Sequence, residues 1–227
     1  MKERLMRRFS RRGFLRLSGG LALGAGAAGA LGTLAWPELG LAAVPASQGY
    51  LLVDTKKCQG CMSCMLACSL VHEGRINPSL ARIQVVQSAF QAFPDDLTLA
   101  QCRQCAEPAC VAACPADALT ADAAHGYVRR VDKTKCIGCM SCVKACPFTP
   151  SRAGWNFEAG HAAKCDLCVE APFFEGPGGP DGKQACVEVC PLKAISFTRE
   201  LPVQAGTEGY MVNLRSTSWR GLGYSTK

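Results

Sequence analysis

The chain has 227 residues, 16 of them cysteine, and a formal net charge of +7. Seven of its 25 Lys and Arg residues but only two of its 18 Asp and Glu residues fall within residues 1–46, so the rest carries a net charge of only +2. No basic patch with interleaved aromatic residues occurs, which excludes a nucleic-acid-binding protein. The cysteines form four tight groups, which argues against the disulfide framework usual in small exported chains.

Residues 1–46 are expected to be an export signal. A basic start is followed by Ser10-Arg11-Arg12-Gly13-Phe14-Leu15-Arg16 and an uncharged stretch, rich in Gly and Ala, that reaches Pro37. The segment resembles a bacterial twin-arginine signal, whose pattern Ser-Arg-Arg-x-Phe-Leu-Lys differs only at Arg16. Cleavage after Ala43 or Ala46 would release a periplasmic protein that is exported folded. The alternative is an uncleaved membrane anchor, because the apolar run is barely long enough to span a bilayer.

Four cysteine quartets follow the signal in chain order. The first and third read Cys-x2-Cys-x2-Cys-x3-Cys, the second reads Cys-x2-Cys-x4-Cys-x3-Cys, and the fourth consists of two pairs separated by an insert at 170–183. Zinc ribbons use pairs of Cys-x2-Cys and need neither the third and fourth cysteine at these intervals nor the Cys-Pro ending seen three times. The quartets are Cys58, Cys61, Cys64 and Cys68; Cys102, Cys105, Cys110 and Cys114; Cys136, Cys139, Cys142 and Cys146; and Cys165, Cys168, Cys186 and Cys190.

The spacing within a quartet suits an iron–sulfur cubane. A Cys-x2-Cys-x2-Cys loop can curl round a cluster and supply three of its corners. The last cysteine lies four residues beyond the third, which is about one helical turn or roughly 6 Å along the axis. The two thiols then share a helix face but reach different clusters, as in two-cluster ferredoxins. Thiolate sulfur suits such clusters better than hard metals, so the sixteen cysteines predict four [4Fe–4S] clusters.

An internal repeat indicates that the chain is built from duplicated units. Residues 53–64 match residues 131–142 at nine of twelve positions, which is consistent with duplication of a ferredoxin-like unit. We expect an α+β, loop-rich fold in which two ferredoxin-like two-cluster units with βαβ-type repeats are fused pseudo-symmetrically over 47–200. Quartets one and four would build one unit, and quartets two and three the other. The expected strands are 50–54, 82–86, the hairpin formed by 118–120 and 127–132, and 194–198.

The quartets, their order and the run Lys164-Cys165-Asp166-Leu167-Cys168 resemble the four-cluster iron–sulfur subunits of the dimethyl sulfoxide reductase type. This family includes subunits of polysulfide and tetrathionate reductases and the electron-transfer protein of formate-dependent nitrite reduction. The resemblance covers about 48–200 and implies four ligand sets. These are Cys58, Cys61, Cys64 and Cys190; Cys165, Cys168, Cys186 and Cys68; Cys136, Cys139, Cys142 and Cys114; and Cys102, Cys105, Cys110 and Cys146.

The remaining features suggest no catalytic machinery. The sequence offers no nucleophile–base pair and no Gly-rich phosphate cradle, so we expect a non-catalytic electron-transfer subunit. His72, His125 and His161 fit no ligand spacing and are expected at the surface or at helix caps. The insert at 170–183 is expected to be a surface loop. The tail at 201–227 could wrap its own domain or a partner, and the partner is favoured slightly because aromatic residues are enriched at interfaces.

The resemblance implies a molybdenum or tungsten pterin enzyme as one partner and a membrane quinone-reactive subunit as the other, in anaerobic respiration. Membrane association would then be indirect. Two alternatives stay open at this point. One is a wire that serves a hydrogenase, an aldehyde oxidoreductase or a cytochrome, and the other is a free periplasmic polyferredoxin that acts as a shuttle.

Overall fold

The structure is a computed structural model that describes residues 44–226, with Pro94 and Thr207 excepted. The expected twin-arginine segment therefore lies almost entirely outside the described residues, as does the possible cleavage point after Ala43. In the described part, no helix combines the length and the apolar composition that a membrane span requires.

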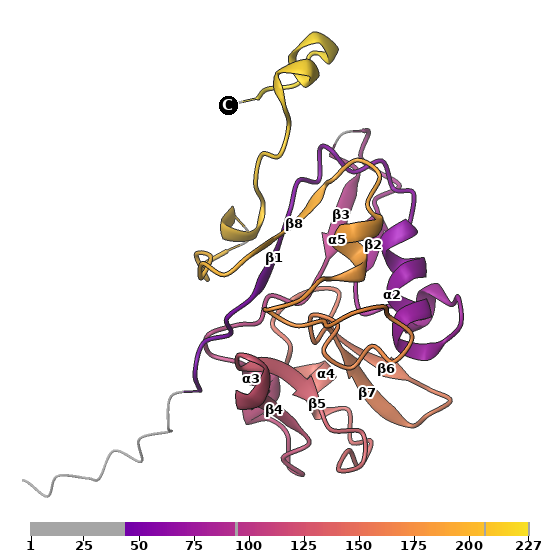
Figure 1. The fold of residues 1–227 in the computed structure, drawn as a ribbon, viewed down its shortest axis with the longest axis vertical. Coiled ribbons are helices and arrows are strands. Elements are labelled where there is room, and N and C mark those ends of the chain that lie inside the picture. The colour runs from indigo at the N-terminus through magenta and orange to yellow at the C-terminus, as the bar shows by residue number, and fades with distance from the viewer. Residues whose placement is uncertain (1–43, 94, 207, 227) are drawn as a thin grey trace, which may run out of the picture. The chain divides into compact units, whose positions relative to one another are not determined.

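Short helices, small antiparallel sheets and long connections make up the described residues, which confirms the expected α+β, loop-rich fold class. All sheets in this part of the chain are two-stranded (Figure 1). The α-helices are α2 (Ser63–Glu73), α3 (Ala109–Ala112), α4 (Ser141–Ala145) and α5 (Ala185–Val189). The strands are β1 (Tyr50–Val53), β2 (Gln84–Gln87), β3 (Leu97–Ala100), β4 (Leu119–Asp122), β5 (Val128–Val131), β6 (Ala153–Asn156), β7 (His161–Lys164) and β8 (Ile195–Thr198).

Strands β1 and β8 pair in antiparallel fashion and join the two ends of the cysteine-bearing region. Tyr50 lies opposite Thr198, and Val53 lies opposite Ile195. Both strands were expected from the sequence, and their pairing brings residues that precede the first quartet next to residues that follow the fourth (Figure 1). The apolar side chains of β1 and β8 are mostly buried, so the pair forms part of the main hydrophobic core.

The helices pack in two pairs, each with its own core. Helix α2 packs against α5, and α3 packs against α4. The first pair belongs to a core that also contains β1, β8, β2 and β3, whereas the second belongs to a core with β4, β5, β6 and β7. Cysteine side chains form part of both cores, so the sites that they build are also packing centres of the fold.

The hairpin expected between the second and third quartets is present. Strand β4 pairs with β5, and a short 3-10 turn that ends at Gly126, with φ of +63°, connects them. Strand β2 was expected one or two residues earlier than it lies, and its partner β3 was not predicted. Strands β6 and β7 were also not predicted; there the Asn156 side chain accepts hydrogen bonds from the backbone N–H groups of Glu158 and Ala159 and so builds the turn.

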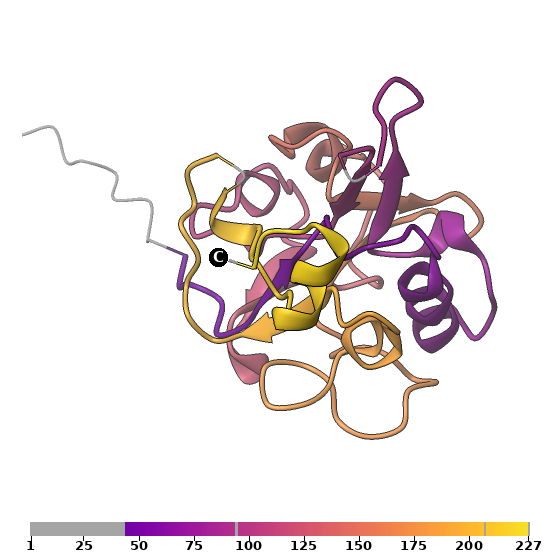
Figure 2. The same ribbon diagram turned by 90° about the horizontal axis from the view of Figure 1, so that it is seen from above.

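The first half of the C-terminal tail packs on its own domain, which is one of the two alternatives expected for it. Tyr210 is 1% exposed and donates a hydrogen bond to the carbonyl of Arg103. The N–H of Val212 bonds to the carbonyl of Val53, so this segment runs beside β1 (Figure 2). The aromatic side chain of Tyr210 is buried in the core of its own domain. Composition alone cannot distinguish such a residue from one that contacts a partner protein.

Candidate metal centres

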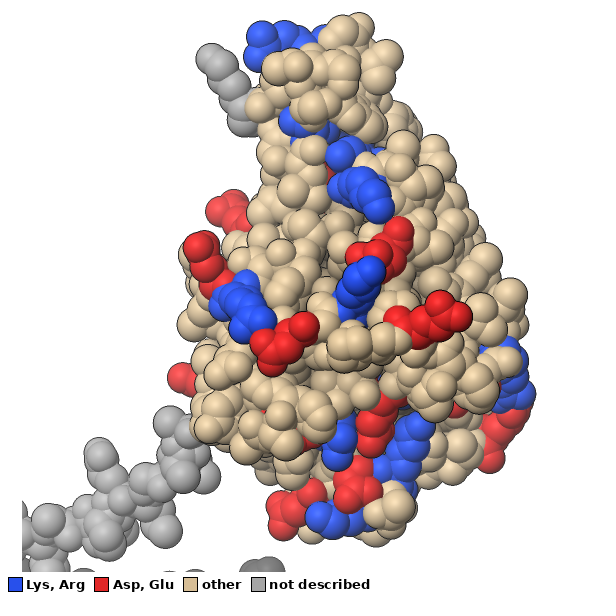
Figure 3. Space-filling view, in the orientation of Figure 1, with Lys and Arg blue, Asp and Glu red and all other residues tan. Residues whose placement is uncertain are grey.

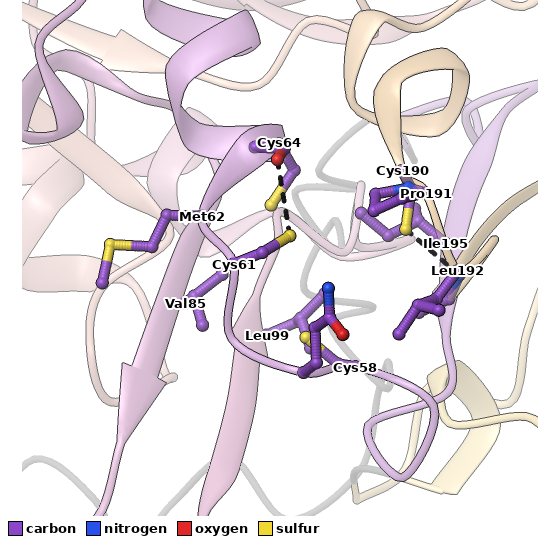
Figure 4. Close-up of a pocket in the computed structure, with 13 residues that line it drawn as sticks. Cys58, Cys61, Met62, Cys64, Val85, Leu99, Cys190, Pro191, Leu192 and Ile195 are labelled. Carbon is purple, nitrogen blue, oxygen red and sulfur yellow. Dashed lines mark hydrogen bonds between the residues drawn. The ribbon is translucent and has the colours of Figure 1, made fainter.

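The first three cysteines of the first quartet lie on a loop whose thiols converge on one hollow. Gly60 has a φ of +73° and Met62 a φ of +59°, so two left-handed residues turn the backbone round the hollow before α2 begins. Figure 4 shows the sulfur atoms of this loop turned toward the sulfur of Cys190, while Met62 points away. The hollow measures about 340 Å³, part of it open to solvent, and its other walls are mainly apolar. Four thiols line it: Cys58, Cys61, Cys64 and Cys190.

The third quartet repeats this geometry 78 residues further on. Gly138 has a φ of +75° and Met140 a φ of +58°, the same two turns at equivalent positions. The Ser63 hydroxyl lies 3.4 Å from Sγ of Cys61 and lowers the pKa of that thiol, and Ser141 acts in the same way on Cys139. A second hollow of about 350 Å³ results, and four thiols line it: Cys114, Cys136, Cys139 and Cys142.

A third hollow of about 300 Å³ lies between α2 and the segment that carries the fourth quartet. Its apolar walls include Leu51, Ile83 and Leu167, each no more than 2% exposed. The thiols that line it come from three segments of the chain: Cys68, Cys165, Cys168 and Cys186. Cys64 and Cys68 leave the same helix face, yet they line different hollows.

The four remaining thiols form a group around Cys110. Burial raises the pKa of Cys110, and charge interactions with Cys102 and Cys146 add to that effect, so these side chains lie close to one another. Burial likewise raises the pKa of Cys105, with further contributions from Cys102 and Cys110. The structure therefore places twelve cysteines around three hollows, four at each, and brings Cys102 and Cys146 near Cys110.

Backbone N–H groups point at several of these sulfur atoms. The last cysteine of three quartets accepts such a bond from a residue downstream: Cys68 from Arg82, Cys146 from Arg152 and Cys190 from Ala194, each with N···S of 3.2 Å. Hydrogen bonds to cluster sulfurs stabilise negative charge and set the reduction potential. The backbone around the thiols therefore suits an anionic metal centre.

The buried thiols are poor metal ligands until a cation binds. Burial raises the pKa of Cys64 and of Cys168 to about 12, and that of Cys142 to about 11. At neutral pH these thiols are protonated, whereas metal ligation requires thiolates. Binding of iron must therefore release protons. The positive charge of the metal stabilises the thiolates, which the apolar walls cannot do.

A buried polar network supports the set that contains Cys68. His72 donates from one ring nitrogen toward the Cys68 carbonyl, 2.8 Å away, and its other nitrogen lies 3.1 Å from Asp166. Arg82 pairs with the second oxygen of Asp166 at 2.9 Å. His72 is 4% exposed, so the expectation of a surface or capping role was wrong. Burial lowers the pKa of His72, but bonds to Asp166 and Cys68 outweigh it and raise the pKa to about 9.

Lys164 is a further functional residue to which sequence reasoning assigned no role. Its side chain is buried, and Nζ lies 2.6 Å from Sγ of Cys102. Burial lowers the pKa of Lys164, but charge interactions with Cys102 and Cys110 outweigh it and raise the pKa above its ordinary value. The signal that could have found it is a lone lysine directly before the metal-binding Cys-x2-Cys of the fourth quartet.

The four sets differ in how far they lie from solvent. Cys61 in the first set and Cys139 in the third quartet are exposed. The two other sets contain only buried or half-buried thiols. Groups of four thiols in three mainly apolar hollows, with N–H donors at several of the cysteine sulfur atoms, fit iron–sulfur clusters and define a protein that binds several of them.

Comparison with known proteins agrees with this class. A family model described as a 4Fe-4S dicluster domain matches residues 95–200, and one described as a 4Fe-4S binding domain matches residues 55–71. The chain belongs to the family of 4Fe–4S ferredoxin-type electron-transfer subunits of oxidoreductase complexes.

The chain aligns with most of the length of individual relatives. The thiosulfate reductase electron transfer subunit PhsB of Salmonella typhi is 35% identical over 67% of this chain and 77% of its own length. An iron-sulfur protein of Rhodospirillum rubrum is 39% identical, with 74% and 87% covered. The hydrogenase-2 operon protein HybA of Escherichia coli O157:H7 is 33% identical, with 78% and 61% covered. Among solved structures, the BamBC complex of benzoyl coenzyme A reductase matches with 20% identity over 66% of this chain and 78% of that one, and a TM-score of 0.35.

Proposed function

We propose that this chain is a non-catalytic wire that relays electrons through four [4Fe–4S] clusters between a molybdopterin-type (Mo or W) catalytic subunit and a membrane quinone-reactive subunit. The observation that carries the proposal is the arrangement of the thiols. Two sets contain an exposed cysteine, Cys61 and Cys139, and two sets lie in the interior. A relay between two partners needs two contacts at the surface, and the two sets with an exposed cysteine support this requirement.

We assign one cluster to each set of thiols that the fold brings together. Each cluster, when bound, accepts or gives up one electron. The hollow-lining geometry supports three of the sets, and the grouping around Cys110 supports the fourth. The proposed sets are Cys58, Cys61, Cys64 and Cys190; Cys68, Cys165, Cys168 and Cys186; Cys114, Cys136, Cys139 and Cys142; and Cys102, Cys105, Cys110 and Cys146.

The residues around the sets serve two purposes. Apolar side chains such as Val85, Leu99 and Ile195 line the closed side of the first hollow, while backbone N–H groups stabilise the negative charge of the thiolates. Met62 and Ile137, beside the exposed cysteines, are 48% and 68% exposed. These two side chains are suited to contact the apolar centre of a partner interface.

Relatives support an enzyme as one partner. PhsB is named for a thiosulfate reductase, which favours a reductase subunit of the kind that the family resemblance implies. A second candidate is a hydrogenase complex, favoured by the match to HybA. In either case the proposed location is the periplasm, reached by the twin-arginine route, with membrane association through the partner or an uncleaved signal.

Native anaerobic purification tests the proposal, combined with iron analysis and mass spectrometry of the co-purifying proteins. We expect about sixteen irons per chain in four cubanes, together with a pterin enzyme and a polytopic membrane subunit. A co-purifying hydrogenase would replace the first partner with the second candidate. A chain that is isolated alone with four cubanes would overturn the complex and favour a free periplasmic shuttle. The N-terminal sequence of the purified chain shows whether the signal is removed.

A further inference from the structure

The two interior sets of thiols lie in opposite electrostatic surroundings. One is the set with Cys102, Cys105, Cys110 and Cys146, here the cationic site. The other is the set with Cys68, Cys165, Cys168 and Cys186, here the neutralised site. Both contain only buried or half-buried thiols, so their exposure to water does not distinguish them. What differs is whether the charged side chains nearby are paired.

Four basic side chains border the cationic site. The Lys164 ammonium lies 2.6 Å from Sγ of Cys102, and the guanidinium of Arg129, which is 0% exposed, donates to the Cys105 carbonyl at 2.8 Å. Arg103 follows Cys102 in the chain and is 7% exposed, and the guanidinium of Arg152 lies among the groups whose charge acts on Cys102 and Cys146.

These cations have no carboxylate partners. Among residues 44–226 as described, no Asp or Glu oxygen lies within 4.0 Å of Lys164, Arg103, Arg129 or Arg152. Arg103 is held instead over the rings of Phe148 and Tyr210, with centroid distances of 4.4 and 5.0 Å. In Figure 3, by contrast, several basic side chains on the visible face lie directly beside acidic ones. The unpaired cations are therefore a feature of this interior site.

At the neutralised site the charged side chains next to Cys68 and Cys168 are paired, and the unpaired Lys164, which precedes Cys165, has its ammonium at Cys102 of the other site. Arg82 lies 2.9 Å from Asp166 and 3.8 Å from Glu73, and His72 lies 3.1 Å from Asp166. Asp166 stands between the ligands Cys165 and Cys168 and accepts the N–H of Cys168. Its carboxylate offsets the positive charge of Arg82 and His72 at this site.

Reduction adds one negative charge to a buried centre. An unpaired cation within a few ångströms stabilises that charge strongly because the interior screens it little. A cation that is already paired with a carboxylate contributes much less. Charge and hydrogen bonds at the ligand sulfurs are the means by which a protein sets cluster potentials.

We propose that the cationic site has the higher reduction potential of the two interior sites, and that Lys164 is the side chain that raises it most. The inference rests on the proposed function, since it requires a cluster in each set. Electron transfer from the neutralised to the cationic site would then be downhill, and a single electron shared between the two would reside mainly at the cationic site.

The test is a potentiometric titration of the anaerobic, fully loaded chain, monitored by electron paramagnetic resonance. Cys110→Ser and Cys186→Ser, one in each interior set, identify the two signals by their loss. We expect the signal of the cationic site to appear at the higher potential. In Lys164→Met, the ratio of reduced to oxidised cationic site, measured at the parent midpoint, should fall at least tenfold, which is ~59 mV for one electron.

Matched variants make the result specific to Lys164. Lys164→Arg keeps the charge and should restore most of the shift, and Lys183→Met removes an exposed charge from the 170–183 loop and should shift neither site. If Lys164→Met fails to load, Arg152→Met should lower the same potential. A cationic site that is reduced at the lower potential would overturn the inference, as would equal shifts of both sites. Fewer than about sixteen irons in the parent would instead overturn the proposed function.

Discussion

The assignment of Cys64 and Cys68 to different clusters leads to a test based on counting irons. The two residues lie one turn apart on α2, yet Cys64 lines the first hollow and Cys68 the third. Serine is a poor ligand for a soft metal centre, so each change to serine should cost one cluster. Each single variant should retain about twelve of about sixteen irons.

The double variant distinguishes separate clusters from a shared one. If Cys64 and Cys68 hold separate clusters, Cys64→Ser combined with Cys68→Ser should retain about eight irons, because independent losses add. If both thiols hold one cluster, the double variant should retain about twelve, like either single variant. Ala67→Ser places a serine on the same helix without touching a ligand and should keep about sixteen.

Iron analysis of anaerobically purified protein gives the count, and electron paramagnetic resonance shows which signal is lost. The two single variants should lose different signals. Loss of the same signal in both, together with about twelve irons in the double variant, would refute the assignment. Complete loss of iron from Cys64→Ser alone would show that the sites do not load independently.

Three further changes probe the frame that holds the sites. Tyr210→Phe leaves the buried carbonyl of Arg103 without its donor and should cost about 1–3 kcal/mol of stability. Gly138→Ala forces a side chain onto a residue with φ of +75° and a Cβ contact of 3.1 Å, so it should lose at least about 1 kcal/mol and retain less iron. Asp166→Asn removes the closer of the two carboxylates beside buried Arg82, leaves only Glu73 at 3.8 Å, and should cost about 3–5 kcal/mol.

Thermal unfolding of loaded protein measures all three, and each has a matched control. Tyr224→Phe, Gly221→Ala and Asp181→Asn make the same chemical changes at half-buried or exposed positions and should shift the midpoint little. Gly221 has open space where a Cβ would go. Equal shifts in a variant and its control would contradict the structural reason given for that variant.

Much of the frame could be predicted because it depends on local patterns. The quartet spacing predicted the helix turn that separates Cys64 from Cys68, and the apolar runs on either side of the quartets predicted β1 and β8. The duplicated stretch shares its Gly and Met positions, and the structure gives both copies the same left-handed turns. The pairing of β1 with β8 agrees with the prediction that the first and fourth quartets belong to one unit.

What could not be predicted depends on contacts between distant residues. Strands β6 and β7 have neither alternation nor β-branched residues, and their turn relies on the Asn156 side chain. Burial of His72 follows from Asp166, which lies 94 residues away. Lys164, Arg103, Arg129 and Arg152 are far apart in the sequence. Only the fold shows that they border the same group of thiols and that no carboxylate pairs with them there.

The pairing of β1 with β8 also constrains the order in which the metal sites can be completed while the chain is being synthesised. The first hollow needs Cys190, and the third needs Cys186, so neither has all its walls until nearly the whole chain has emerged. The thiols from the second and third quartets, by contrast, are all present once Cys146 has been made. Since chains emerge N-terminus first, the middle of this protein can close before its ends. A chain cut short after 150 would have every cysteine of two sets and only a part of the two others.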